Sequence, residues 1–314
     1  MKITKKQHYV SKFYLKAWTF DGKKSLFCLM NDKIFPSNIE NLAQERYFYE
    51  IREINFEEIN FLKNVIYKNN NSELVKSYLD FINISNNSFK LIKISNLFEE
   101  TDSEKVENIF KKDLKEHHEN YFAELEDKVA PLFEKLIEGD KSFLNDSEQK
   151  KFFLLHISAQ YFRTKSMKAN LKKLEDIMKN TKYGNVSIEN IFTHISVYFS
   201  INMASNINEM NSNIVFIKNL TDEDFITSDQ PIINIWKAKN LEKEKIEEVE
   251  LYIPIAPKLA VLISKTIPYD LEIFDVEEVK EYNNHIVNFS LEQIFANKKE
   301  QLEYYRIVRN SFNN

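Results

Sequence analysis

The feature of this sequence that most constrains its fold is a change of hydrophobic spacing close to residue 212. Between about 104 and 211, apolar residues recur at helical spacing in stretches at roughly 104–139, 148–179 and 187–211. From 214 to about 265, short runs rich in β-branched residues alternate with polar turns and prolines, as in antiparallel strands. Because helices are followed by strands without regular alternation, we predict an α+β fold: a helical core of long helices with a C-terminal, mainly antiparallel sheet.

The remaining segments complete this prediction. Asp21-Gly22 indicates a turn, and residues 25–35 are expected to form a hairpin with Asn31-Asp32 at its tip. Further expected elements are helices at about 56–68, 73–83 and 275–298, a loop at 68–72, a kink or break at Pro131, and a closing strand within 303–310.

We predict a single domain over residues 1–314, because the helical pattern resumes on both sides of each polar link. Its expected parts are an N-terminal segment and hairpin in 1–50, a helical core in 51–211, and a sheet with a closing helix in 214–310.

Composition excludes several classes of protein. The 314 residues are 43% hydrophobic, which is enough for a substantial core. The net charge of −5 lacks the basic footprint of a protein that coats nucleic acid, although a local basic patch is still compatible with it. The single cysteine, Cys28, excludes an intrachain disulfide framework. Because no leader and no apolar run of membrane-spanning length is visible, we expect a cytoplasmic protein that does not bind membranes.

Glycine is scarce, and this narrows the enzyme classes. Phosphate loops and dinucleotide fingerprints require several glycines in one short run, whereas this chain contains three in all, at Gly22, Gly139 and Gly184. We therefore expect neither NAD nor ATP as a cofactor. The Gly-x-Ser-x-Gly elbow of many serine hydrolases is also absent.

The segment HISAQYFRTK (156–165) places His156, Gln160 and Arg163 on one face of a helix whose other residues are mostly apolar. A guanidinium stays protonated in proteins, and burying it without a partner is very costly. We therefore predict that Arg163 is less than one-third exposed and pairs with a carboxylate, with Glu126 or Asp229 as candidates. A structural ion pair and an anionic ligand such as phosphate are equally compatible with this segment.

Three other segments contain candidate polar groups. FITSDQPI (225–232) ends a strand with Ser228 and Asp229, which suit either a site at a sheet edge or ordinary turn capping. In YFAELEDKVAP (121–131), Glu126 falls on the apolar side of a helix, whereas most acidic helix residues are simply solvated. The pair His117-His118, amid Lys and Glu, is expected to be exposed. Asn284 lies in a C-terminal helix, where a solvated amide is the alternative.

The opening segment KKQHYVSKFYLKAWTF (5–20) combines Gln7 and His8 with five aromatic rings. These rings must be buried for the segment to be ordered, and their burial would carry His8 toward the core. We predict that His8, Gln160, Arg163 and Asp229 come together.

Taken together and in this order, these segments resemble a bacterial family known as domain of unknown function 4238. The matching segments are QHYVSKFYL (7–15), Leu125-Glu126, QYFRT (160–164), TSDQP (227–231), and an asparagine in a later helix, Asn283 or Asn284. The resemblance covers nearly the whole chain. Ser11 stands where the family usually has proline, which puts the rigidity of the opening segment in doubt.

The resemblance implies that His8, Glu126, Gln160, Arg163 and Asp229 form a common site, in which Gln7, Ser228 and Asn284 would contact substrate. Such a set suits acid–base chemistry on a phosphate ester, or a divalent metal ion held by His8, Glu126 and Asp229. The corresponding hypothesis is a nuclease-like phosphodiester hydrolase acting on nucleic acid or a nucleotide, as an effector of phage defence or a toxin.

Two alternatives remain. The chain could be a non-catalytic module that binds a protein partner or a small anionic ligand, or its polar residues could form a buried network that holds the opening segment to the core. A site should be reached by a pocket open to solvent, whereas a structural network should be sealed and fully paired.

Overall fold

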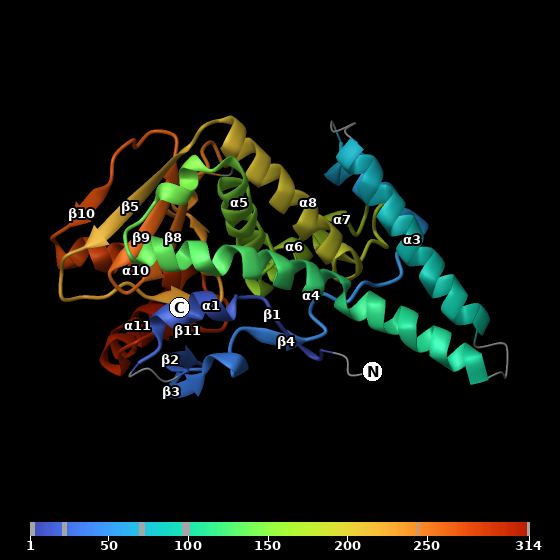
Figure 1. The fold of residues 1–314 in the computed structure, drawn as a ribbon, viewed down its shortest axis with the longest axis horizontal. Helices are drawn as coiled ribbons and strands as arrows, with labels where there is room; N and C mark the ends of the chain where they lie inside the picture. Colours follow the sequence, from blue (N-terminus) through green and yellow to red (C-terminus); the bar gives the residue numbers. More distant parts are fainter. Residues whose placement is uncertain (1–3, 21–23, 69–72, 96–100, 244, 313–314) are drawn as a thin grey trace. The chain divides into compact units, whose positions relative to one another are not determined.

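The computed structural model describes residues 4–20, 24–68, 73–95, 101–243 and 245–312 and shows an α+β fold, as predicted (Figure 1). Its contacts group the chain into two compact units. The first unit is Met1–Gln7, Glu45–Glu124 and Met167–Phe199, and the second unit is His8–Gln44, Leu125–Ser166 and Ser200–Asn314. No unit boundary falls at the change of pattern near residue 212, because both units combine segments that are distant in sequence.

The first unit is helical. Its elements include α2 (Phe56–Phe61), the π-helical turn η3 (Leu62–Ile66), α3 (Glu73–Ser95) and α7 (Leu174–Met178). A capping box begins α2, since Asn55 accepts from the Glu58 amide and Glu58 accepts from the Asn55 amide. Buried aliphatic side chains such as Leu62, Ile188 and Ile191 form its core. Helix α3 extends well past the predicted end at 83.

The extension of α3 has a local cause. The polar residues at 83–88 follow the predicted end of the helix, but Ser85 and Ser88 donate hydrogen bonds from their hydroxyl groups to the carbonyl oxygens of Phe81 and Ile84, four residues earlier. These bonds satisfy the serine side chains within the helix, so the Asn- and Ser-rich segment stays helical.

The middle helices are α4 (Thr101–Ile137), α5 (Ser147–Phe162), α6 (Lys165–Lys172) and α8 (Ile188–Glu209). Asp146 caps α5 by accepting from the amides of Glu148 and Gln149. The prediction of one helix over 148–179 was wrong, because α5 ends at Phe162. Pro131 does not divide α4; its ring lies on an exposed position of the helix, where the carbonyl left without a partner can be hydrated.

The second unit contains a five-stranded sheet in the order β10-β5-β9-β8-β7. Its strands are β5 (Asn213–Asn219), β7 (Ile233–Asn234), β8 (Leu251–Ala256), β9 (Leu259–Ser264) and β10 (Leu271–Ile273). All neighbours pair antiparallel except β10, which is parallel to β5. The predicted, mainly antiparallel sheet is therefore confirmed, and the short helix α9 (Ile235–Lys239) follows β7.

A second, four-stranded sheet joins residues from both ends of the chain in the order β3-β2-β11-β6. Its strands are β2 (Ser25–Met30), β3 (Lys33–Asn38), β6 (Thr227–Ser228) and β11 (Ile294–Ala296). The hairpin β2–β3 was predicted, and both tip residues, Asn31 and Asp32, have positive φ angles of 50° and 60°. Strands β1 (Lys6–His8) and β4 (Gln44–Arg46) pair separately.

The C-terminal prediction was partly wrong. Helix α10 (Val276–Phe289) ends before 298, and the expected closing strand is helix α11 (Lys299–Phe312). Leu302 and Tyr305, three residues apart, are buried on one face of α11, whereas Ile307 is exposed. Helical amphipathicity therefore prevailed over the β propensity of this segment.

Within the described residues, no helix has the length and apolarity required to cross a membrane. The predicted turn at Asp21-Gly22 and residues 69–72 of the predicted loop lie outside the described residues.

Candidate functional site

The opening segment is ordered by burial of its aromatic residues in the second unit. Ser11 precedes helix α1 (Lys12–Leu15), which continues into the 3-10 turn η1 (Lys16–Trp18). The Tyr14 hydroxyl donates to the Pro254 carbonyl oxygen at 2.6 Å, and Trp18 Nε1 donates to the Phe225 carbonyl oxygen at 3.2 Å. These bonds attach the segment to the region around the sheet. The predicted burial is confirmed for Tyr9, Tyr14 and Trp18, whereas Phe13 and Phe20 are half-buried.

Four polar side chains in the second unit form what we call the Arg163 cluster: Ser11, Glu126, Gln160 and Arg163. Arg163 Nη2 donates to Glu126 Oε1, to Ser11 Oγ at 2.6 Å and to Gln160 Oε1 at 3.2 Å. Ser11 Oγ donates to Glu126 Oε1 at 2.9 Å. The amide of Gln160 is used at both ends, because its Nε2 donates to the Tyr9 carbonyl oxygen at 2.7 Å and its Oε1 accepts from the Ser11 amide at 3.2 Å.

Burial of the Arg163 cluster fits the prediction made for its charge. The Arg163 side chain is 1% exposed and forms an ion pair with Glu126, whose side chain is 22% exposed. The predicted burial and carboxylate pairing of Arg163 are therefore confirmed, with Glu126 as the partner. Arg163 is the residue that caps the C-terminus of α5, with φ −88° and ψ 21°. Its backbone amide still donates to the Ala159 carbonyl oxygen, so the last turn of the helix positions the side chain.

His8 lies close enough to the Arg163 cluster to be affected by its charges. Its Nε2 donates to the Glu40 carbonyl oxygen at 3.2 Å, and the ring is half-buried. Burial is the main cause that lowers the His8 pKa, and Lys12 and Arg163 act in the same direction, whereas the Glu40 bond and Glu126 oppose it. A neutral ring that donates through Nε2 keeps Nδ1 as its basic nitrogen.

Asp229 is bonded to backbone amides, as in the turn-capping alternative for this residue. Its fully buried carboxylate accepts hydrogen bonds from the backbone amides of Leu291, Glu292 and Gln293 at 2.9, 2.6 and 2.9 Å. Burial raises the pKa of Asp229 to about 6, against the lowering effect of these amides and of Arg309. Within the described residues, no hydrogen bond joins this carboxylate to His8, Gln160 or Arg163. The Asp229 carboxylate therefore caps backbone amides, which is the alternative that the sequence analysis gave for it.

The QYFRT and TSDQP segments are connected through the residues that follow Arg163 and Asp229 in the sequence. Thr164 Oγ1 donates to Gln230 Oε1, and Gln230 Nε2 donates to the carbonyl oxygens of Tyr161 and Ile232. Ser228 Oγ accepts from the Gln230 amide at 3.1 Å, a bond typical of a turn. The QYFRT and TSDQP segments thus meet, but through Thr164 and Gln230.

The two remaining predicted contact residues, Gln7 and Asn284, have other surroundings. Gln7 belongs to the first unit, where its side chain accepts from the Tyr49 amide and donates to the Lys115 carbonyl oxygen. Asn284 on α10 has a buried Oδ1 without a hydrogen-bond partner among the described residues. Its neighbour Asn283 is the structural amide of this helix.

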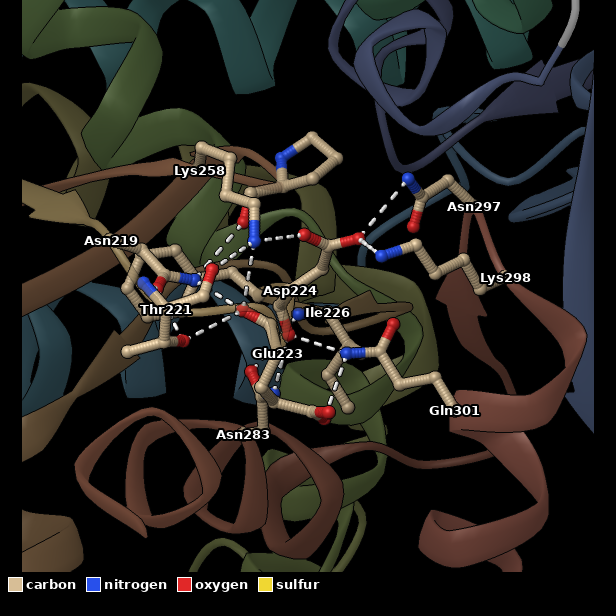
Figure 2. Close-up of polar contacts among 12 residues, drawn as sticks. Asn219, Thr221, Glu223, Asp224, Ile226, Lys258, Asn283, Asn297, Lys298 and Gln301 are labelled. Carbon is tan, nitrogen blue, oxygen red and sulfur yellow. Dashed lines mark hydrogen bonds and ion pairs between the residues drawn. The ribbon is translucent and has the colours of Figure 1, made fainter. Parts of the chain in front are cut away.

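Asn283 belongs to a network that holds the loop between β5 and β6 (Figure 2). It accepts from the Ile226 amide and donates to the Asp224 carbonyl oxygen at 3.0 and 2.8 Å. The Asp224 carboxylate is almost fully buried and pairs with Lys258 and Lys298, each at 2.6 Å. Lys258 also donates to the carbonyl oxygens of Thr221 and Glu223, so the network fixes the loop that leads into β6.

A metal site is not formed by the predicted ligands. Among the described residues, no group of three or more His, Cys, Asp or Glu side chains is arranged to hold a metal ion, and this includes His8, Glu126 and Asp229.

A cavity of about 260 Å³ lies in the second unit beside the opening segment. We call it the Phe13 pocket. One wall consists of residues from the opening segment, including Phe13, Lys16 and Ala17, and the opposite wall comes from α4. Ile255 of β8 contributes to the lining. The residues of α4 in this wall are Ala130, Phe133, Glu134 and Ile137.

Sequence analysis missed the Phe13 pocket, although a signal was present. The α4 residues that line it follow the i, i+3, i+4, i+7 spacing of one helix face. The pocket is mainly apolar, with the exposed charges of Lys16 and Glu134 among its lining residues. Neither charge forms an ion pair with another described residue.

Comparison with known proteins supports one assignment. A search of curated proteins and a search of solved structures gave no significant match. The family model described as "Protein of unknown function (DUF4238)" matches residues 6–300, nearly the whole chain. The match includes the opening segment, the Arg163 cluster and the TSDQP turn, as the resemblance indicated. The chain therefore belongs to the DUF4238 family.

Proposed function

We propose that this protein is a non-catalytic ligand-binding module, in which the Arg163 cluster fixes one wall of the Phe13 pocket. The observation that carries the proposal is the contrast between a polar cluster whose members bond to one another and an apolar cavity lined by the same two elements. Ser11, Gln160 and Arg163 are each no more than 1% exposed. A ligand could displace their mutual bonds only at the cost of stranding a buried guanidinium.

The cluster and the pocket share the same two elements. Ser11 lies two residues before Phe13 in the opening segment, and Glu126 lies one helical turn before Ala130 in α4. The bonds from Ser11 to Glu126 and from Gln160 to Tyr9 therefore hold the two pocket walls at a fixed separation. Fixed walls favour binding, because less conformational entropy is lost when a ligand orders the site.

The lining indicates the class of ligand. Aromatic and aliphatic side chains such as Phe13, Phe133 and Ile137 suit an apolar body, while Lys16 offers a cation to an anionic group. We infer a small aromatic or aliphatic carboxylate, with Glu134 favouring ligands that also carry an ammonium group. This is a small anionic ligand, one of the partner classes expected from the sequence.

The proposal is tested by filling the pocket. Binding of phenylacetate, phenylalanine and phenethylamine to the full chain is measured by ligand-observed NMR. Ala130→Leu should abolish saturable binding, because it places a larger side chain in the cavity. Ala123→Leu is the matched control, an exposed alanine on the same helix that does not line the pocket. Equal binding by both variants would refute the proposal, as would the absence of binding by the wild type.

A second candidate function is hydrolysis of a phosphodiester in nucleic acid or a nucleotide. It is favoured by one observation: among the predicted catalytic residues, His8 and Glu126 keep partial solvent access, and His8 lies within the electrostatic range of Glu126. A neutral histidine beside a carboxylate can act as a general base.

The hydrolase candidate is tested with RNA, DNA and bis-p-nitrophenyl phosphate, with and without Mg²⁺, Mn²⁺ or Zn²⁺. If it holds, His8→Ala should reduce the rate by about a hundredfold or more, whereas Lys33→Ala, at an exposed position of β3, should not. In bacteria, loss of toxicity and of RNA or DNA cleavage on His8→Ala would support a role in defence. Unchanged rates in His8→Ala would remove this candidate.

A further inference from the structure

The first unit contains a separate cavity of about 170 Å³, which we call the His118 pocket. Its lining comes from α3, α4 and α8 and is rich in rings. The main lining residues are Tyr78, Phe81, His117, His118, Tyr121 and Val197. Since ligand pockets for larger compounds usually occupy about 300 Å³ or more, this cavity suits a smaller molecule.

His118 is the feature that sets this cavity apart. It was expected to be exposed, but its ring is only 5% exposed, and among the described residues neither ring nitrogen forms a hydrogen bond. Its neighbours are rings: Phe81 lies edge-on at 5.7 Å and His194 at 6.0 Å. A buried polar group without a partner is destabilising, and native structures rarely keep one without a reason.

The protonation states around the pocket define what it can offer. Burial lowers the pKa of His118 well below its usual value, so the imidazole is neutral and presents one N–H donor and one acceptor nitrogen. The Tyr78 hydroxyl is likewise buried without a partner among the described residues, and burial raises its pKa, so it remains a protonated phenol. The pocket therefore presents both hydrogen-bond donors and acceptors.

The rest of the lining restricts the occupant further. No Lys, Arg, Asp or Glu side chain is among the described residues that line the cavity, so a charged molecule would find no counter-ion there. The described residues also form no metal-binding group of His, Cys, Asp or Glu side chains. Ring faces and edges on several sides, such as Phe81 and His117 with centroids 4.8 Å apart, favour a flat aromatic occupant.

We propose that the His118 pocket binds a small, flat, uncharged heteroaromatic molecule that both donates and accepts hydrogen bonds through ring nitrogens, with His118 and Tyr78 as its partners. This site lies in the first unit and goes beyond the function proposed for the Phe13 pocket.

The probes are benzimidazole, which donates and accepts through its ring nitrogens, and indene, a hydrocarbon of nearly the same shape. Binding to the full chain is followed by ligand-observed NMR and calorimetry, with CD melting as a check on folding. Wild type should bind benzimidazole more tightly than indene. His118→Phe keeps an aromatic ring in place, so it should weaken benzimidazole about tenfold or more and leave indene nearly unchanged. Tyr78→Phe should weaken benzimidazole to a smaller extent.

His285→Phe in the second unit is the matched control and should leave both affinities unchanged. The proposal is overturned if wild type shows no saturable benzimidazole binding, or if folded His118→Phe and Tyr78→Phe both bind it as wild type does. Should His118→Phe not fold, Tyr78→Phe alone decides between these outcomes. A metal site would be identified instead by stoichiometric Zn²⁺ binding that benzimidazole does not displace. In that case His117→Ala or Tyr78→Phe should change the affinity for only one of the two, Zn²⁺ or benzimidazole.

Discussion

The Arg163 cluster and the His118 pocket both place polar side chains in apolar surroundings, and they differ in how those side chains are paired. In the cluster, the side chains of Arg163, Ser11 and Gln160 form hydrogen bonds with one another. They also form hydrogen bonds with the Glu126 carboxylate and the Tyr9 carbonyl oxygen. In the pocket, His118 and Tyr78 leave polar atoms without protein partners. Paired groups stabilise a fold, whereas unpaired ones cost free energy that a ligand can recover. Residue type alone does not distinguish these cases, since histidine and glutamine look equally functional in a sequence.

The largest effect is expected for Glu126→Ala. Removing this carboxylate leaves the Arg163 guanidinium buried without its charged partner, and arginine cannot become neutral. The free energy of unfolding should fall by about 3–5 kcal/mol, measured by urea denaturation. The double variant Glu126→Ala/Arg163→Met should regain part of this loss, because no buried charge remains. Additive losses in the double variant would show that the two residues are not coupled.

Asp229→Ala should be the next largest effect. It leaves the backbone amides of Leu291, Glu292 and Gln293 without their acceptor in a buried site, at a cost of about 3 kcal/mol. Hydrogen exchange at these three amides should accelerate relative to β8 and β9. Ser37→Ala, on the edge strand β3, is a control that should change neither quantity. Wild-type stability in Asp229→Ala would mean that the carboxylate serves another purpose.

The limits of sequence-based prediction are visible in these same residues. Periodicity predicted the α+β class and the antiparallel sheet, and the apolar surroundings of Arg163 predicted its burial and its carboxylate partner. Sequence patterns could not predict that Asp229 caps the backbone amides of residues 291–293, because that contact joins positions more than 60 residues apart. The charged residues beside His118 in the sequence predicted an exposed ring, whereas its spatial neighbours in the fold include Phe81 and His194, and the ring is buried. Spatial neighbours, rather than sequence neighbours, decide whether such side chains are paired.

Acid should destabilise the first unit more than the second. Burial lowers the pKa of His194 to about 4 and that of His118 well below the usual value, so the unfolded chain binds more protons than the folded one as the pH falls through 6.5. The stability contributed by these neutral rings is complete above about pH 7 and is lost on acidification. For His194 alone the loss between pH 7 and 5 is about 2 kcal/mol.

In the second unit two buried groups act in opposite directions. The lowered pKa of His156 makes acid destabilising, whereas the raised pKa of Asp229 makes protonation favourable in the folded state between about pH 6 and 4. Hydrogen exchange measured from pH 7 to 5 should therefore show openings growing first in the helices of the first unit. His194→Leu should reduce this difference. Equal acid sensitivity of both units would contradict the assignment of neutral histidines.

The smallest effect is expected for His8→Ala. The ring is half-buried, and its hydrogen bond to the Glu40 carbonyl oxygen is worth about 1 kcal/mol. A melting temperature within a few degrees of the wild type is expected for a domain of this size. A loss as large as that of Glu126→Ala would place His8 inside the Arg163 cluster rather than at its edge.

The Arg163 cluster has paired polar side chains, and the His118 pocket has unpaired ones. This difference is tested most directly by measuring the free energies of unfolding of Glu126→Ala and His118→Phe by urea denaturation under the same conditions. Glu126→Ala should lower the free energy of unfolding, because it breaks a buried ion pair. His118→Phe should leave it unchanged or raise it, since an unpaired polar ring is replaced by an apolar ring of similar shape. Opposite or clearly unequal effects are the predicted result. If His118→Phe costs as much as Glu126→Ala, the histidine is paired within the fold, and the distinction between a structural cluster and a ligand pocket is wrong.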